Sequence, residues 1–250
     1  MTVGSLFSGI GGLDLGLERA GHRVLWQVES NAFCRRILAQ HWPDVPCYSD
    51  VKKLTGTNLE PVDLLCGGFP CQPVSQAGQR KGTDDDRWLW PHFARLLGVL
   101  RPSYALLENV PGLLTANGGH AFGAILADLA DCGYDAEWDC LPAAALGAPH
   151  LRYRVFLLAV LADADAQRLE GERADSDTER WERSAAGSPG LRGRASRFFD
   201  AQIGGQWTVE PSVGRVAHGV PHRVDRLKSL GNAVVPQIAE WIGRRLNDAS

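Results

Sequence analysis

The sequence predicts an α/β fold of the Rossmann-like kind, in which a mostly parallel sheet carries helices on both faces. Short apolar runs alternate with helical patterns over the first 160 residues, which is typical of strands joined by crossover helices. Several runs are apolar on both faces, as expected of strands buried between two layers. Ligands of such sheets bind beyond the carboxyl ends of the strands, so we expect the chemistry just after each strand.

The strands and helices can be assigned in chain order from these periodicities. Five apolar runs predict the strands Thr2–Phe7, Arg23–Glu29, Val62–Cys66, Tyr104–Glu108 and Arg154–Val160. Helical spacing of apolar residues predicts the helices Leu13–Ala20, Asn31–His41, Trp88–Leu100 and Phe122–Cys132. A last helix, Val234–Leu246, follows a turn at Gly231-Asn232 and tolerates Pro236 in its first turn.

The pattern changes at Ala162. Residues 162–211 are polar, arginine-rich and weakly periodic, so they form either a small irregular lobe or a partly disordered segment. We therefore predict three regions. Residues 1–161 form the main domain, residues 162–211 form a short separate region, and residues 212–250 return to complete the main domain.

The composition indicates an intracellular protein. The chain has 250 residues, 44% of them hydrophobic, which suffices for one sizeable core or one domain with a small lobe. No apolar run approaches the ~18 residues of a membrane span, and the N-terminal MTVGSLFSG lacks a signal-peptide pattern. We expect a cytoplasmic location and no membrane contact. The six cysteines contain no C-x-x-C pair, so we expect reduced thiols and no metal site.

The net charge of −3 argues by itself against a nucleic-acid partner. The charge is unevenly distributed, however. Residues 183–228 carry 8 basic and 3 acidic side chains, and a local basic surface can bind phosphates on an otherwise acidic protein. An ordinary solvated surface is the alternative.

A glycine-rich turn follows the first strand, at Phe7–Gly12, and opens a helix. Glycines let a backbone approach a ligand closely and direct amides at it. The spacing is G-x-G-G, not the G-x-G-x-x-G of dinucleotide sites. Glu29 comes 20 residues after Gly9, where such folds place an acid for ribose hydroxyls. With Asp50 as a partner for an adenine amino group, the pattern favours a nucleoside-type cofactor over a simple tight turn.

Three further strand ends carry reactive side chains. Cys71, fixed between Pro70 and Gln72, follows the strand at Val62–Cys66, and a thiolate there is a candidate nucleophile. Glu108 leaves the same sheet edge, and a desolvated carboxyl tends to hold its proton. Alternation along the strand puts Arg152 and Arg154 on one face. Taken singly, these residues also fit a core cysteine, a salt-bridge partner and surface arginines.

Together, and in this order, the motifs resemble those of the C5-cytosine DNA methyltransferase family. The matching strings are LFSGIGGLDLGLERAG, GGFPCQPVSQAG, ENV, RYRVF and GNAVVPQIAEWIG, together with Glu29 and Asp50. They extend over nearly the whole chain. One departure is His150, which stands where the family often has a glutamine. The resemblance implies the S-adenosylmethionine-dependent methyltransferase fold with a small irregular target-recognition lobe in residues 162–211.

The resemblance also implies the cofactor, S-adenosyl-L-methionine, and the residues of its pocket. Those residues are Phe7, Ser8, Gly9, Gly11, Gly12, Glu29, Ser30, Asp50, Val51, Pro70, Leu89, Asn232 and Ala233. Because Asn232 lies far along the chain, the final helix must fold back against the first half.

The implied reaction is that of a DNA (cytosine-5-)-methyltransferase. Cys71 adds to C6 of a flipped-out cytosine, Glu108 bonds N3 and the exocyclic amine, and Arg154, with Arg152, orients the base. The loop Val74–Asp86 closes over the base. The residues implied to touch duplex DNA are Ser75, Gln76, Gln79, Arg80, Lys81, Arg192, Arg194, Arg197 and Arg215.

Several alternatives stay open. A tRNA cytosine-5 methyltransferase would share the chemistry, and a catalytically silent DNA-binding relative would share the fold. The short recognition region predicts a short or relaxed recognition sequence, or help from a partner. We expect a monomer that acts on duplex DNA, with a cognate restriction endonuclease as one potential partner; phage self-protection and regulation are other roles.

Overall fold

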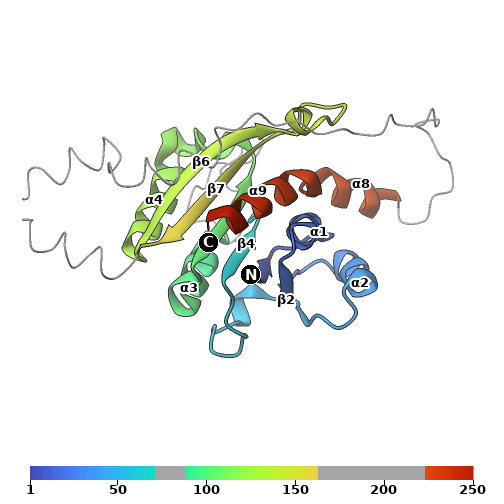
Figure 1. Cartoon of the computed structure of the whole chain (residues 1–250), viewed down its shortest axis with the longest axis horizontal. Helices are drawn as coiled ribbons and strands as arrows, with labels where there is room; N and C mark the ends of the chain where they lie inside the picture. Colours follow the sequence, from blue (N-terminus) through green and yellow to red (C-terminus); the bar gives the residue numbers. More distant parts are fainter. Residues whose placement is uncertain (71–87, 163–222, 250) are drawn as a thin grey trace, which may run out of the picture.

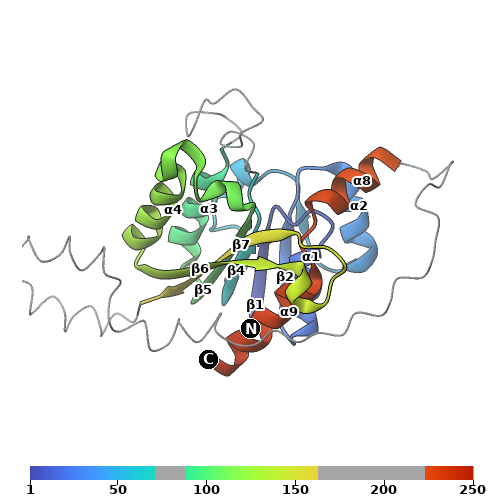
Figure 2. The same ribbon diagram turned by 90° about the horizontal axis from the view of Figure 1, so that it is seen from above.

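The structure is a computed structural model, and it describes residues 1–70, 88–162 and 223–249. Within these ranges the chain forms a seven-stranded sheet with helices on both faces (Figures 1 and 2). The strand order is β3-β2-β1-β4-β5-β7-β6. The strands are β1 (Thr2–Leu6), β2 (Arg23–Val28), β3 (Cys47–Tyr48), β4 (Leu64–Gly67), β5 (Tyr104–Asn109), β6 (Tyr134–Pro142) and β7 (Tyr153–Leu161).

The first five strands run parallel, and β7 and β6 complete the sheet as antiparallel neighbours of β5. The predicted mostly parallel sheet is therefore confirmed. Because β7 runs against β5, its beginning lies at the edge where β5 ends, with Asn109 opposite Val155. The carboxyl ends of β1, β2, β4 and β5 thus share one edge with the start of β7.

The predicted helices are confirmed to within a few residues at their ends. The described helices are α1 (Gly12–Arg19), α2 (Ala32–His41), α3 (Trp90–Leu100), α4 (His120–Asp131), α8 (Arg223–Asn232) and α9 (Pro236–Ala249). Short 3-10 turns lie at η1 (Val51–Lys53), η3 (Pro111–Leu113), η4 (Ala116–Gly119) and η5 (Ala143–Leu146).

Besides the two-residue strand β3, one strand and one helix were not predicted, β6 and α8. The β6 segment reads YDAEWDCLP, and its alternating acids gave no continuous apolar run. It lies at the edge of the sheet, where half-exposed polar residues are tolerated. The α8 segment RVDRLKSLGN ends on Gly231-Asn232, which sequence reasoning took only as the turn before the last helix. The structure therefore adds a helix that ends at this turn.

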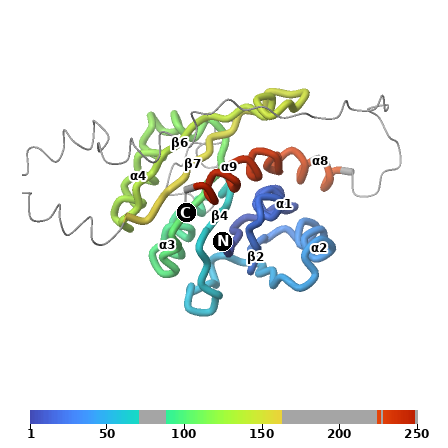
Figure 3. The backbone as a smooth tube through the Cα atoms, viewed as in Figure 1, coloured from blue at the N-terminus to red at the C-terminus, as the bar shows by residue number. Residues whose placement is uncertain are grey.

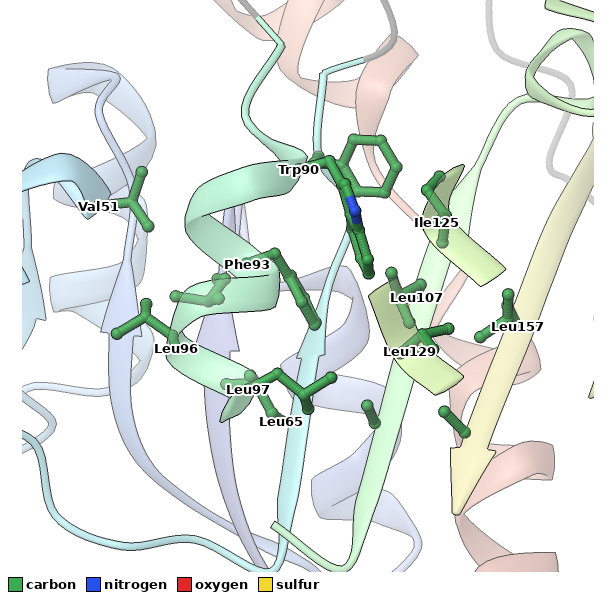
Figure 4. Packing of buried hydrophobic residues seen from close by; sticks show 14 of the residues in the cluster. Val51, Leu65, Trp90, Phe93, Leu96, Leu97, Leu107, Ile125, Leu129 and Leu157 are labelled. Carbon is green, nitrogen blue, oxygen red and sulfur yellow. The ribbon is translucent and has the colours of Figure 1, made fainter. Parts of the chain in front are cut away.

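One face of the sheet is covered by α3 and α4 (Figure 2). Figure 4 shows Trp90, Phe93, Leu96 and Leu97 of α3 packed over the sheet. The rings of Trp90 and Phe93 stack with centroids 5.5 Å apart. The indole N–H of Trp90 donates to Asp128 Oδ2 at 2.6 Å, so this large ring is buried with its polar atom satisfied.

The other face is covered by α1 and α9, which lie side by side (Figure 3). Close approach depends on glycine, because a Cβ at Gly16 would collide with the Pro236 carbonyl and with Ala239. Polar contacts add to the packing, since His22 Nε2 lies 3.0 Å from Gly243 O and Asn247 Nδ2 donates to Ala20 O at 2.8 Å. The expectation that the final helix folds back against the first half is confirmed.

No helix in the ranges that the structure describes is long and apolar enough to cross a membrane. The predicted boundaries of the three regions stay predictions, since residues 163–222 lie outside the described residues.

Candidate active site

A cavity of about 750 Å³ opens at the sheet edge where the parallel strands end. Its volume lies in the range of small-molecule sites. Twelve of the thirteen residues predicted for the cofactor line it, namely Phe7, Ser8, Gly9, Gly12, Glu29, Ser30, Asp50, Val51, Pro70, Leu89, Asn232 and Ala233. Glu108 and Arg154 line the same cavity. The structure therefore brings the predicted cofactor residues and two of the predicted catalytic residues into one space.

Gly11 is the predicted pocket residue that does not line the cavity. It precedes α1 with φ 84°, a left-handed conformation that favours glycine. A Cβ there would collide with the Trp42 ring and approach Leu38. In this structure Gly11 allows the turn and lets it pack on α2.

The turn between β1 and α1 has an unusual backbone. Phe7 has φ 55° and Gly9 has φ 58°. A left-handed conformation in a residue with a bulky side chain is strained, and such strain is often found at functional sites. The turn directs the Gly9 amide at the Glu29 carboxylate, which accepts from it at 2.8 Å.

Glu29 joins this turn to the start of α2. Its Oε2 accepts from the Gly9 N–H, and its Oε1 accepts from the Asn31 N–H at 2.7 Å. Each carboxylate oxygen can accept a further hydrogen bond, so Glu29 can shape the turn and still face a ligand hydroxyl. Asp50 lines the same cavity, and its Oδ1 accepts from Lys52 N at 3.0 Å at the start of η1.

A buried polar network lies beneath the turn. Asp14 is fully buried and accepts from Gln27 Nε2 at 2.8 Å and from Ser5 Oγ at 3.0 Å. Ser8 Oγ lies 2.9 Å from Ser5 Oγ. Burial raises the pKa of Asp14 to about 6, although the hydrogen bonds from Gln27 and Ser5 lower it. Asp14 was assigned no role from the sequence.

Glu108 is buried at the end of β5, where Arg154 Nε lies 3.0 Å from its Oε1. Burial raises the pKa of Glu108 to about 7, against the opposing effect of the Arg154 and Arg152 charges. A Cβ at Gly68 would stand 2.7 Å from Glu108 Oε2, so glycine at this position leaves room for the carboxyl. The predicted proton-bearing carboxyl thus has a physical basis in this structure.

Arg152 and Arg154 lie in different surroundings. β7 begins at Tyr153, and Arg152 precedes it with φ 36°, so strand alternation does not extend to Arg152. The guanidinium of Arg152 donates to Gly231 O at 2.8 Å and to Ala233 O at 2.5 Å. Arg154 instead contacts Glu108. Strand alternation therefore does not place the two arginine side chains on one face. Both guanidinium charges nevertheless lower the pKa of Glu108.

Phe69 and Asn109 fix the backbone next to the predicted nucleophile. Asn109 Nδ2 donates to Phe69 O at 3.0 Å. The Phe69 ring meets Trp88 edge-on with centroids 5.5 Å apart, and it lies 5.6 Å from Trp90. Because Pro70 and Trp88 border residues 71–87, this contact brings the two borders of that segment together. Phe69, the phenylalanine of the GGFPCQ string, is therefore a buried packing residue.

The predicted nucleophile, Cys71, lies outside the described residues, as do Ser75, Gln76, Gln79, Arg80, Lys81, Arg192, Arg194, Arg197 and Arg215. Their predicted roles stay predictions. Across residues 1–70, 88–162 and 223–249, no group of three or more His, Cys, Asp or Glu side chains could hold a metal ion.

Further cavity residues were missed by sequence reasoning: Leu13, Val28, Asn31, Cys34, Ser49, Lys52, Gly68, Phe69, Asn109, Val110, Lys228, Ser229 and Val234. Several directly adjoin predicted residues, so a wider window around each strand end would have found them. Lys228 and Ser229 carried no such signal. They reach the cavity because α8 lies against α2, where Ser229 Oγ is 3.4 Å from Cys34 Sγ.

The arrangement can perform acid–base chemistry beside a bound nucleoside. Apolar Phe7, Val51 and Leu89 offer surfaces for a base, and Glu29 and Asp50 offer carboxylates for hydroxyl or amino groups. The buried Glu108, with a pKa near neutrality, can hold or donate a proton in the same cavity.

The chain is similar to curated bacterial enzymes. It is 36% identical over 166 residues to "Type II methyltransferase M2.BsuMI" of Bacillus subtilis (strain 168), which covers 64% of this chain and 42% of the relative. It is 39% identical over 157 residues to "Type II methyltransferase M.NgoMIV" of Neisseria gonorrhoeae, covering 61% of this chain and 49% of the relative. The chain spans about half the length of the curated relatives it matches.

Solved structures agree with the fold. A putative DNA modification methyltransferase encoded within an Escherichia coli prophage superposes with a TM-score of 0.55 at 30% identity, over 72% of this chain and 49% of the other. A DNMT2 mutant from Spodoptera frugiperda gives a TM-score of 0.54 at 22% identity, over 65% of this chain and 50% of the other. The second likeness supports the fold alone.

The family comparison covers the greater part of the chain. The model of the C-5 cytosine-specific DNA methylase family matches residues 1–187, which include the cavity residues from Phe7 to Arg154. The chain therefore belongs to the C-5 cytosine-specific DNA methylase family.

Proposed function

We propose that this protein transfers a methyl group from S-adenosyl-L-methionine to C5 of cytosine in duplex DNA. The observation that carries the proposal is the Glu108–Arg154 pair. It lies in the same cavity as the cofactor residues, and its carboxyl has a pKa of about 7. A generic small-molecule methyltransferase would need the cofactor pocket but not a buried acid beside the Pro-Cys motif.

The described residues fit the cofactor. Gly9 and Gly12 allow close approach of the backbone, Glu29 and Asp50 both line the cavity, and Phe7 supplies an apolar wall. Asn232 and Ala233 close the cavity from the C-terminal segment. When bound, S-adenosyl-L-methionine supplies an electrophilic methyl group on its sulfonium.

Cytosine C5 is a poor nucleophile, and the residues of this chain would activate it. The Cys71 thiolate would add to C6, which breaks the aromatic ring and places carbanion character on C5. Glu108 would give its proton to N3 and accept from the exocyclic amine, which favours the enamine-like adduct. The Arg154 guanidinium would keep Glu108 oriented and stabilise the base.

The adduct would resolve after the methyl group is on C5. A base removes the C5 proton, the electron pair re-forms the C5–C6 double bond, and the Cys71 sulfur leaves as thiolate. N3 returns its proton to Glu108, which restores the acid for the next cycle. The ring is aromatic again, and no external oxidant or reductant is consumed. C6 is inaccessible in a stacked duplex, so the cytosine must be flipped out at a cost of roughly a few kcal/mol.

Duplex DNA is the proposed partner, contacted by the predicted residues between Ser75 and Lys81 and by the arginines from Arg192 to Arg215. A cognate restriction endonuclease and a monomeric state belong to the same proposal, as does a cytoplasmic location. The relatives named as type II methyltransferases support the association with DNA modification.

Methyl transfer from labelled S-adenosylmethionine, to duplex DNA in one reaction and to tRNA in another, tests the substrate. We expect label in DNA. Label confined to tRNA would overturn the DNA assignment, and label in neither substrate by a protein that binds the cofactor would identify a silent relative.

Duplexes with 5-fluorocytosine at the methylated site test the mechanism. Fluorine cannot leave as the proton does, so the wild-type protein should remain bound to the DNA after denaturation. Cys71→Ser should form no adduct yet keep its cofactor affinity. An adduct that persists in Cys71→Ser would show that the nucleophile is another residue.

A further inference from the structure

The Arg152 guanidinium contacts the backbone of the C-terminal segment. One nitrogen, Nη2, donates to the carbonyls of both Gly231 and Ala233, at 2.8 and 2.5 Å. The residue has φ 36°, a conformation that a side chain-bearing residue adopts only at a cost. The contact with Gly231 joins residues 79 positions apart in the sequence, from the start of β7 to the end of α8.

The Gly231 carbonyl is one that a helix end leaves unpaired, and the Ala233 carbonyl lies just beyond that end. Gly231 lies in the last turn of α8, and Ala233 follows the helix. The last carbonyls of a helix lack partners within it, and they form the negative end of the helix dipole. A guanidinium satisfies both requirements with one group. Arg152 therefore fixes the end of α8 to the start of β7.

The same connection is fixed from its other side. A Cβ at Gly12 would collide with the Val234 carbonyl, so α1 lies in direct backbone contact with the segment after α8. Residues 231–236 thus lie between the Arg152 side chain and the glycine face of α1. Shifting either neighbour would move this segment.

The segment is a wall of the cavity. Asn232, Ala233 and Val234 line it. The Arg152 charge also acts on Glu108, whose other cationic neighbour is Arg154. Arg152 therefore links the C-terminal wall of the cavity to the Glu108–Arg154 pair.

We propose that Arg152 is a positioning residue, which holds the 231–234 segment against the cofactor and in register with the Glu108–Arg154 pair. In this role its guanidinium acts through the backbone of the C-terminal segment rather than by bonding the target base. The first half of this proposal concerns cofactor binding, which can be measured without any nucleic acid. The second half, the alignment with Glu108, rests on the proposed function.

Calorimetric titration of the full chain with S-adenosylhomocysteine, without DNA, tests the first half. Arg152→Ala should bind about tenfold more weakly, since the loss of charge-assisted hydrogen bonds loosens the wall. The affinity of Arg152→Lys should lie between that of the wild type and that of Arg152→Ala, because an ammonium can reach one carbonyl but lacks the planar guanidinium. Arg244→Ala is the matched control. It removes an exposed arginine paired with Glu240 and should leave affinity unchanged.

The dependence of kcat/KM on pH tests the second half. Removing the Arg152 charge should raise the pKa of Glu108 and move the basic limb of the profile to higher pH in Arg152→Ala. Arg152→Lys keeps the charge and should keep the limb in place. Gly12→Ala should displace Val234 from the other side, and so weaken S-adenosylhomocysteine binding without moving the limb.

The outcomes separate the readings. If Arg152→Ala and Arg152→Lys bind S-adenosylhomocysteine as the wild type does, the positioning role is wrong, and loss of activity alone would assign Arg152 to the base. If Arg152→Ala does not fold, Arg152→Lys and Gly12→Ala decide the question. A wild-type protein that binds S-adenosylhomocysteine but methylates nothing would refute the proposed function, while the affinity comparison would still support or overturn the positioning role.

Discussion

At the scale of single residues, the two buried carboxyls have different consequences. Glu108 lies in the cavity, paired with Arg154, and its pKa of about 7 leaves a proton available near neutrality. Asp14 lies beneath the cofactor turn, hydrogen-bonded to neutral partners, with a pKa raised to about 6. Desolvation is the main cause in both cases. We expect the first carboxyl to affect the rate of the proposed reaction and the second to affect stability.

Glu108→Gln should lower kcat/KM on the order of 100-fold, because an amide can imitate the hydrogen bonds but cannot transfer the proton. If protonated Glu108 is the active form, wild-type activity should fall as pH rises past about 7. That basic limb should be absent from Glu108→Gln. Methyl transfer measured from pH 5.5 to 9 checks both expectations.

Glu240→Gln is the control for this experiment. Glu240 pairs with Arg244 along α9 and does not line the cavity. Its profile should match that of the wild type. A basic limb that persists in Glu108→Gln would contradict the assignment of Glu108 as the acid.

Asp14 should make stability depend on pH. Its pKa is raised from 3.8 to about 6, so the folded state binds the proton more tightly than the unfolded state. The free energy of unfolding should therefore fall as pH rises from about 4 to about 6, by about 3 kcal/mol. Asp14→Asn should remove this contribution, as measured by urea titration at pH 4.5 and pH 7.

Asp63→Asn is the matched control, because Asp63 is shifted in the opposite direction. Its pKa is lowered mainly by the Thr2 backbone N–H, so its stabilising effect is lost only as pH falls below about 4. The slope between pH 4.5 and 7 should survive in Asp63→Asn. If the slope also survives in Asp14→Asn, another group is responsible for it.

At the scale of elements, helix packing decides what a glycine does. Gly16 in α1 and Gly123 in α4 are both helical, but a Cβ at Gly16 would strike the Pro236 carbonyl and Ala239, whereas a Cβ at Gly123 has open space. Helix propensity alone favours alanine at both positions by about 1 kcal/mol. The difference in stability change between Gly16→Ala and Gly123→Ala therefore measures the effect of the α1–α9 contact.

Gly123→Ala should raise the free energy of unfolding by about 0.5–1 kcal/mol. Gly16→Ala should lower it by about 1–3 kcal/mol, because the collision with backbone outweighs the propensity gain. Urea denaturation of both variants checks the pair. Two variants that are equally stabilised would mean that α9 can move away from α1 at little cost.

At the scale of the whole molecule, the cofactor cavity joins distant parts of the chain. Residues between Phe7 and Asp50 and residues between Lys228 and Val234 line it together. A ligand that contacts both segments binds the folded state and not the unfolded chain, so it should stabilise the whole domain. S-adenosylhomocysteine at 100 times its Kd should add about 2.7 kcal/mol.

Thermal unfolding with and without S-adenosylhomocysteine measures this linkage. The wild-type melting temperature should rise with ligand concentration, and Glu29→Ala should abolish most of the rise. Glu240→Ala, outside the cavity, should retain it. A wild-type melting temperature that does not respond to the ligand would contradict the cofactor assignment.

The sequence by itself determined the order of strands and helices and the residues at the strand ends. These follow from local patterns: alternation with periods of 2 and 3.6 residues, and glycines where a turn needs them. Phe7, Glu29, Asp50 and Glu108 could be predicted because each ends a strand, and parallel strands bring their ends to one edge. The edge strand β6 and helix α8 could not, because their patterns are mostly polar.

Only the tertiary structure decided how these residues act. The pKa of Glu108 depends on burial and on Arg154, which is brought near by the antiparallel pairing of β7 with β5. The contact of Arg152 with Gly231 and Ala233 joins residues about 80 positions apart. Desolvation and long-range hydrogen bonds depend on which distant segments pack together, and a pattern read along the chain cannot supply that information.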